Sequence, residues 1–143
     1  MIGPADIMGA EVLGVLFILI MGIVLLPLIF FFVSMMKTLQ ACSPQNRTME
    51  PGMVWLNLIP LFNLGWIFYT ISCISNSLSN EFNERKIENN GQFGFGVGVA
   101  MAVCNIVSII PVVGLFTSIA SLVLWIVYWV QIVGFKNKII QAG

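Results

Sequence analysis

The sequence alternates long apolar stretches with short polar ones. A helix needs about 20 apolar residues to cross a bilayer, and four stretches approach that length: residues 12–36, 53–76, 93–110 and 115–135. We expect the second helix to leave the membrane and to continue to about residue 86. The pattern therefore predicts an all-α fold, an integral membrane four-helix bundle that forms a single transmembrane domain over residues 1–143.

The first apolar stretch, from Val12 to Met36, contains no charged residue. A cleavable signal peptide has a positively charged start and an apolar core of about 7–15 residues. Residues 1–11 contain no Lys or Arg, and the apolar stretch is longer than such a core. We therefore expect a first span that is retained rather than removed.

Prolines interrupt two of the four stretches, and a third proline lies between the last two. Pro27 and Pro60 are each expected to kink a helix, because proline removes a backbone hydrogen bond. Asn57 and Asn63 flank Pro60, so their amides are expected to bond the backbone groups that this break frees. No polar loop separates the third and fourth stretches, and Pro111–Gly114 predicts a tight hairpin between them.

Small residues recur on one face of the third stretch. Gly94, Gly98 and Ala102 are spaced at i, i+4 and i+8, and such a face lets two helix backbones approach closely in lipid. A glycine-rich phosphate loop would need a preceding strand and a following Lys-Ser or Lys-Thr, and neither is present. We expect a helix-packing role.

The second helix becomes amphipathic beyond its apolar start. One of its faces is polar and provides a candidate lining for a pore or surface for a partner: Tyr69, Ser72, Asn76 and Ser79. The following charged run is either a solvated helix end or a docking surface: Glu81, Glu84, Arg85 and Lys86.

The distribution of basic residues predicts an orientation. Four spans put both termini and the central loop on one side of the membrane. That side carries four basic residues against two on the other: Arg85, Lys86, Lys136 and Lys138 against Lys37 and Arg47. Since cytoplasmic loops are enriched in Lys and Arg, we expect both termini in the cytoplasm.

Composition narrows the function. Only 8% of the residues are charged and 59% are hydrophobic, whereas soluble domains are about 25% charged. The net charge is zero and the chain has no histidine. We therefore expect no nucleic-acid partner, no cofactor, no metal site and no enzyme, because a nucleophile in the spans would have no base beside it.

The second stretch also carries a pattern of aromatic, proline and asparagine residues: Trp55, Pro60, Asn63-Leu64 and Trp66. This pattern resembles a motif of uncharacterised bacterial multi-pass membrane proteins of the domain-of-unknown-function type. The resemblance implies a bacterial inner-membrane location, and it implies no site residues.

These observations favour a small, non-catalytic membrane protein that acts by assembly. It would be an accessory subunit of a membrane complex or a self-associating scaffold, with the lipid bilayer and either its own copies or other membrane subunits as partners. The alternative is a homo-oligomeric passive channel.

Overall fold

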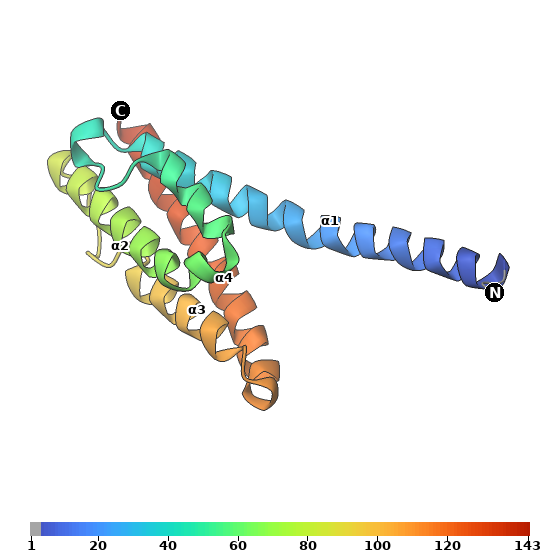
Figure 1. Ribbon diagram of the computed structural model, residues 1–143. Coiled ribbons are helices and arrows are strands. Elements are labelled where there is room, and N and C mark those ends of the chain that lie inside the picture. Colours follow the sequence, from blue (N-terminus) through green and yellow to red (C-terminus); the bar gives the residue numbers. More distant parts are fainter. Residues whose placement is uncertain (1–3) are drawn as a thin grey trace. The chain divides into compact units, whose positions relative to one another are not determined.

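Helices make up most of the chain that the computed structural model describes, which comprises the backbone of residues 4–143 and the side chains from Met8 onward. This part of the chain forms α1 (Pro4–Ala41), α2 (Pro60–Glu84), α3 (Phe95–Val107) and α4 (Pro111–Ala142). Two 3-10 helices, η1 (Pro44–Asn46) and η2 (Pro51–Leu58), lie between α1 and α2 (Figure 1). No strand occurs among the residues described, so the predicted all-α class is confirmed. The predicted domain also includes residues 1–3, which lie outside the described part.

The chain divides into two units, residues 1–31 and residues 32–143. The described part of the first unit belongs to α1, and Pro27 lies inside this helix without ending it. Proline removes one hydrogen bond of a helix, and the apolar sequence on either side of Pro27 remains helical. Most side chains between Met8 and Leu26 are apolar and exposed.

The stretch predicted as one kinked helix over residues 53–76 consists of two separate elements. The 3-10 helix η2 ends at Leu58, Ile59 adopts an extended conformation, and α2 begins at Pro60. Proline suits the first position of a helix because its missing N–H has no partner there. The prediction of a kink at Pro60 was therefore wrong about the kind of interruption, which is a complete break.

The third and fourth helices form a hairpin, as predicted, but its turn lies earlier in the chain. The helix α3 ends at Val107, and Pro111 is already the first residue of α4. Residues 108–110 make the turn, and Gly114 lies so close to the carbonyl oxygen of Ser108 that a side chain would collide with it. The predicted turn Pro111–Gly114 is instead the first turn of α4.

The two Ile-Pro steps of the chain have the same local structure. Ile59 and Ile110 are both extended residues immediately before a helix that begins with proline. The N–H of Asn63 donates to the carbonyl of Ile59 at 2.8 Å, and the N–H of Gly114 donates to that of Ile110. Each step therefore ends one element and begins the next.

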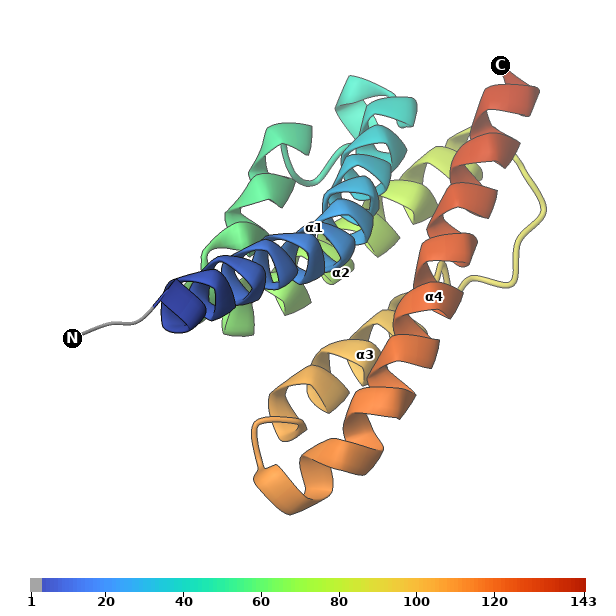
Figure 2. The ribbon, with the colours of Figure 1, turned by 90° about the vertical axis from the view of Figure 1, so that its right-hand side faces the viewer.

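The core of residues 32–143 lies where α2, α3 and α4 meet. The helix α3 packs mainly on α4 and also on α2, and Figures 1 and 2 both show α3 beside the first half of α4. Fully buried side chains come from all three helices: Ile71, Ile74, Leu78, Met101, Tyr128 and Ile132. An aromatic cluster of Phe82, Phe93 and Phe135 extends this core, with ring centroids 5.1–5.8 Å apart.

Two of the four predicted spans are long and apolar enough to cross a membrane in the described part of the chain. These are Met8–Ala41 of α1 and Pro111–Ala142 of α4. Only 11% and 17% of their most apolar segments are buried, so neither resembles the buried core helix of a soluble protein. The helix α3, with 13 residues, is shorter than the length that a span needs.

Gly98 provides a test of the packing between α3 and its neighbours. A Cβ atom at this position would lie 2.8 Å from Cγ2 of Ile71 and 2.9 Å from Cε2 of Tyr128. We expect Gly98→Ala to lower the free energy of unfolding by about 1–3 kcal/mol, because overpacking forces neighbouring side chains to shift. Thermal unfolding in mild detergent measures this effect.

Gly96→Ala is the matched control, because a Cβ atom there would meet nothing within 4 Å. Alanine is the better helix former by about 0.5–1 kcal/mol, so this variant should be as stable as the parent or slightly more stable. Equal destabilisation by both variants would contradict the packing described.

Candidate functional site

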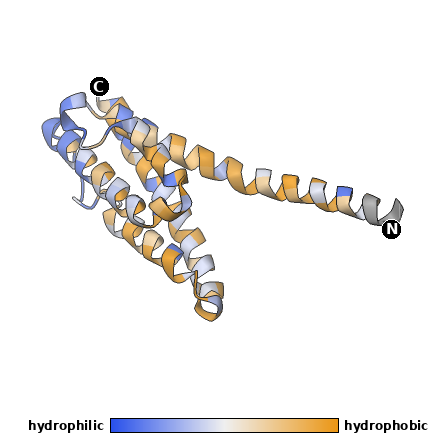
Figure 3. Ribbon diagram, viewed as in Figure 1, coloured by the Kyte–Doolittle hydropathy of each residue, from blue (hydrophilic) through white to orange (hydrophobic). Residues whose placement is uncertain are grey.

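Polar and charged residues gather at one end of the unit formed by residues 32–143. Figure 3 shows the hydrophilic positions of this unit concentrated at the end that holds the C-terminus. Three segments contribute to it: residues 37–50, 81–92 and 136–143. We call this end the polar cap. It contains all six Lys and Arg residues of the chain, at positions 37, 47, 85, 86, 136 and 138.

The carboxylate of Glu81 is the centre of the polar cap. Its side chain is 0% exposed. One oxygen accepts hydrogen bonds from the N–H of Ser43 at 2.7 Å and from the amide of Asn46 at 2.8 Å. The other accepts from the hydroxyl of Ser43 at 3.0 Å and from Nε of Arg85 at 2.6 Å. We call these four residues the Glu81 cluster.

The environment of Glu81 favours the ionised carboxylate. Desolvation by burial raises the pKa of this group, but the hydrogen bonds from Asn46, Ser43 and Arg85 outweigh it and hold the pKa below its usual value. Desolvation and the charge of Glu81 act in the same direction on the neighbouring thiol of Cys42, and they raise its pKa to about 12. Cys42 is therefore an unreactive, protonated thiol at neutral pH.

Two arginines extend the polar cap to the ends of other helices. Arg47 donates to the carbonyl oxygens of Cys42 and Gln40 at 2.9 and 2.8 Å. These carbonyls belong to the C-terminal end of α1, where the backbone lacks helical partners. Arg85 donates to the carbonyl of Ile139 in α4 at 3.3 Å. The cap thus joins the C-terminal ends of α1, α2 and α4.

The segment after α1 also follows the side of α2. The hydroxyl of Thr48 donates to the carbonyl of Cys73 at 2.9 Å and lies 3.1 Å from the hydroxyl of Ser77. Further along, the indole N–H of Trp66 donates to the carbonyl of Met53 at 3.1 Å. Residues 43–53 therefore run back along α2 in the opposite direction.

This arrangement corrects one expectation from the sequence. The four-span topology placed Lys37 and Arg47 on the opposite side of the membrane from Arg85 and Lys86. The hydrogen bonds from Ser43 and Asn46 to Glu81 bring the first loop and the C-terminal end of α2 to the same end. The predicted count of four basic residues against two therefore does not describe the structure.

The predicted helix-packing residues come together inside the chain. Gly98 lies between Ile71 of α2 and Tyr128 of α4, and Ala102, one turn further, is 1% exposed. Gly94 has a φ of 74°, a left-handed conformation that suits glycine, and caps the start of α3. The small face of α3 thus contacts the other helices of the same molecule.

The residues around the Ile59–Pro60 break differ in their bonding. The amide of Asn57 donates to the carbonyl of Val54 at 2.8 Å and to the hydroxyl of Thr70 at 3.1 Å. Asn57 therefore bonds a carbonyl inside η2, rather than a group freed at the break, and also connects η2 to α2. The buried Oδ1 of Asn63 has no donor among the residues described, so this oxygen does not bond the break either.

The predicted polar face of α2 is exposed or partly exposed along its length. Tyr69 and Asn76 are exposed, and Ser72 and Ser79 are partly exposed. The hydroxyl of Ser72 donates to the carbonyl of Phe68, within its own helix. Tyr69 of this face also belongs to an aromatic ladder with Phe62 and Trp66, which precede it in α2. The ring centroids are 4.9 Å apart for Phe62 and Trp66 and 4.8 Å apart for Trp66 and Tyr69.

The predicted docking run divides into a buried and an exposed part. Glu81 is inside the cluster and is not available to a partner. Glu84, Arg85 and Lys86 are exposed residues, and Glu84 accepts a hydrogen bond from Asn46. Lys86 has a φ of 53° and follows the end of α2.

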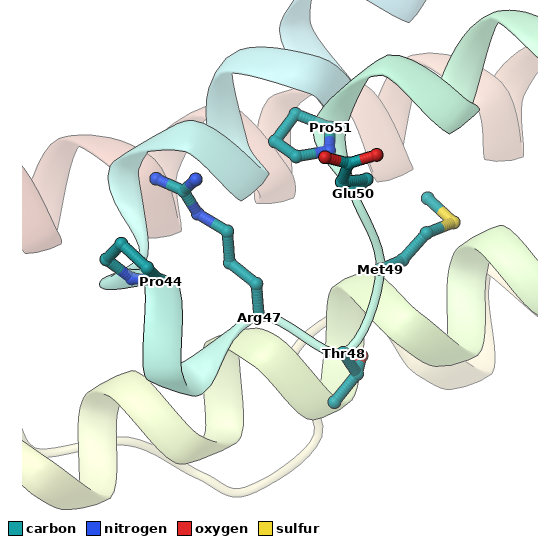
Figure 4. A pocket seen from close by; sticks show the side chains of 6 residues that line it. All are labelled: Pro44, Arg47, Thr48, Met49, Glu50 and Pro51. Atoms are coloured by element: carbon teal, nitrogen blue, oxygen red, sulfur yellow. The ribbon is translucent and has the colours of Figure 1, made fainter.

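An open depression of about 360 Å³ lies at the surface of the polar cap, on residues 44–51. Figure 4 shows the residues that line it: Pro44, Arg47, Thr48, Met49, Glu50 and Pro51. The guanidinium of Arg47 is already committed to the carbonyls at the end of α1. No group of three potential metal ligands occurs among the residues that the structure describes.

The sequence reasoning missed the partners of Glu81 and the polar contacts between residues 43–48 and α2. One signal for Glu81 was available. It lies seven residues after Ile74 and three after Leu78, so it continues the apolar face of an amphipathic helix. A carboxylate in that register predicts burial with partners. No comparable signal identified Ser43, Asn46 or Thr48, because their contacts are 25–38 residues away along the chain.

Comparisons of the chain with protein-family models, with curated proteins and with solved structures gave no significant match.

The Glu81 cluster makes a prediction for stability. We expect Glu81→Gln to lower the free energy of unfolding by about 1–3 kcal/mol, because the buried donors of Ser43 and Asn46 would lose charged acceptors. Glu84→Gln is the control, since this carboxylate is exposed and its loss should cost less than about 0.5 kcal/mol.

The same variant predicts a pH dependence. Since folding lowers the pKa of Glu81, its stabilisation is complete above the ordinary carboxyl pKa of about 4.3 and is lost as the pH falls through the folded pKa. The stability difference between the parent and Glu81→Gln should therefore shrink as the pH is lowered below about 4.3. Chemical unfolding in detergent from neutral to acidic pH measures it, and a difference that grows on acidification would contradict the assignment.

Proposed function

We propose that the chain is a small integral membrane protein that acts by assembly, as an accessory subunit of a membrane complex or as a self-associating scaffold. Its embedding in lipid is supported by α1 and α4, which are apolar, long and largely unburied. Exposed apolar surface costs about 25 cal/mol per Å² in water, and a bilayer removes this cost. The resemblance noted for Trp55 to Trp66 supports a bacterial inner membrane.

The observation that carries the assembly role is the polar face of α2. Tyr69 and Asn76 remain exposed although the opposite face of the helix is fully buried. Hydroxyl and amide groups at the edge of a bilayer are stabilised when they hydrogen-bond across helices. A second helix of the same kind, or of another subunit, would provide those bonds.

The alternative is a homo-oligomeric passive channel lined by the same face. In a closed ring, the hydroxyl groups of Ser72 and Ser79 and the amide of Asn76 would surround an aqueous path. The absence of acidic and basic residues from this face fits a passive path, because ion-coupled transport normally uses such groups.

The state of the protein in mild detergent tests the assembly role. We expect a defined oligomer or fixed co-purifying subunits, and we expect Asn76→Trp to reduce that assembly, because the bulky ring would separate the polar faces. Gln45→Trp is the matched control, since Gln45 is an exposed polar residue outside this face. A parent protein that is monomeric and without partners would contradict the proposal. Ion flux through a closed ring in liposomes would favour the channel instead.

A further inference from the structure

The segment from η2 through α2 has both of its ends in the polar cap and its turn in an apolar region. In the cap, Ser43 and Asn46, which precede η2, bond to Glu81 near the end of α2. Between η2 and α2, the chain reverses at Ile59 and Pro60. The neighbours of this turn are apolar and exposed, and Leu61 is 85% exposed. A turn in water would be expected to carry polar residues.

The lengths of the two arms match each other and are shorter than a membrane. The eight residues of η2 rise by about 16 Å at the 3-10 helix value of 2.0 Å per residue. The apolar part of α2, residues 60–71, rises by about 18 Å at 1.5 Å per residue. The hydrocarbon core of a bilayer is about 30 Å thick. Neither arm reaches across it.

Several backbone groups at the turn have hydrogen-bond partners within the chain. An unsatisfied backbone group in lipid costs several kcal/mol. Pro60 has no N–H, the N–H of Ile59 donates to Leu56, and the carbonyl of Ile59 accepts from Asn63. Asn57 is buried, and its amide bonds Val54 and Thr70 rather than facing outward.

The charges agree with a single exposed side. No charged residue occurs between Glu50 and Glu81. All six basic residues of the chain lie in the polar cap. Since Lys and Arg are enriched on the cytoplasmic side of membrane proteins, the count of six at one end favours a cytoplasmic cap, including the C-terminus.

We propose that residues 51–84 form a re-entrant hairpin, which enters the bilayer from the side of the polar cap, turns at Ile59–Pro60 among the acyl chains and returns to the same side. The partner of the exposed apolar surface around Leu61 is the hydrocarbon interior of the membrane. This inference rests on the proposed membrane embedding, and it replaces a crossing of the bilayer by α2.

Cysteine accessibility tests the hairpin in the full-length protein. Cys42 and Cys73 are buried, so Cys104→Ala serves as the background. Single cysteines are introduced by Gln45→Cys, Asn90→Cys and Asn137→Cys in the cap and by Leu61→Cys at the turn. A membrane-impermeant maleimide is applied to inverted inner-membrane vesicles and, separately, to intact spheroplasts.

We expect the three cap positions to react in inverted vesicles and not in spheroplasts, and position 61 to react in neither. After solubilisation and unfolding, the Leu61→Cys variant should take up one label more than the Cys104→Ala background, in which Cys42 and Cys73 also become accessible. Reaction of position 45 from the side opposite to position 90 would overturn the hairpin and leave the membrane embedding intact. Reaction of position 61 in spheroplasts would also overturn it. Release of the parent protein by alkaline carbonate would instead contradict the proposed function.

A second variant does not depend on labelling. The hydroxyl oxygens of Thr48 and Ser77 are 3.1 Å apart, so the double variant Thr48→Cys and Ser77→Cys should form an intramolecular disulfide on mild oxidation of the membranes. The matched pair Gln45→Cys and Asn137→Cys, for which the structure gives no contact, should not. A Thr48–Ser77 pair that stays reduced in folded protein would show that the two segments do not meet and would overturn the proposal.

Discussion

The polar cap depends on a carboxylate that is removed from water. Burying an ion costs several kcal/mol unless close partners replace its hydration, and Glu81 obtains four hydrogen bonds from Ser43, Asn46 and Arg85. Two of these bonds come from one residue of the loop after α1. That loop therefore has little freedom once the carboxylate is in place, and the direction in which the chain leaves the cap toward η2 follows from it. Arg85, which also bonds Ile139, connects the same carboxylate to α4.

A second constraint acts at the opposite end of residues 32–143, where the two turns contain no charge. Helices that end among apolar surroundings leave backbone groups without partners. Both turns reduce that cost in the same way, by beginning the next helix with a proline and by using the preceding isoleucine carbonyl as an acceptor. The similarity of these turns is local. Their neighbours differ, since Asn57 supports the first, and the second is closed by the contact of Gly114 with Ser108.

The pattern of apolar residues correctly predicts the all-α class of the described residues, because apolar runs of this length leave few alternatives. It could not distinguish a kink from a break at Pro60, since both are equally apolar and only the start of the hydrogen-bond ladder differs. It also could not find the bonds from Ser43 and Asn46, which depend on how the chain folds back. The register of Glu81 on the apolar face of α2 was the one readable sign of the cluster. Gly98 was recognised as a close-packing position, and the structure gives it partners within the chain.

The difference between four spans and a re-entrant hairpin changes more than a count of crossings. Assigning basic residues to two sides presupposes which loops share a side, so one misplaced crossing moves Lys37 and Arg47 to the side of the other four basic residues. The hydrogen bonds of Glu81 are independent of any such count, and they bring loop and helix end together without reference to a membrane. With the cap on one side, the polar face of α2 begins where the apolar arm ends. Tyr69 lies at this transition, and Trp and Tyr concentrate at the boundary of the bilayer. In the proposed hairpin, the same helix would offer apolar surface to lipid and polar surface to a neighbouring helix at successive depths, which is the arrangement that an assembling membrane subunit requires.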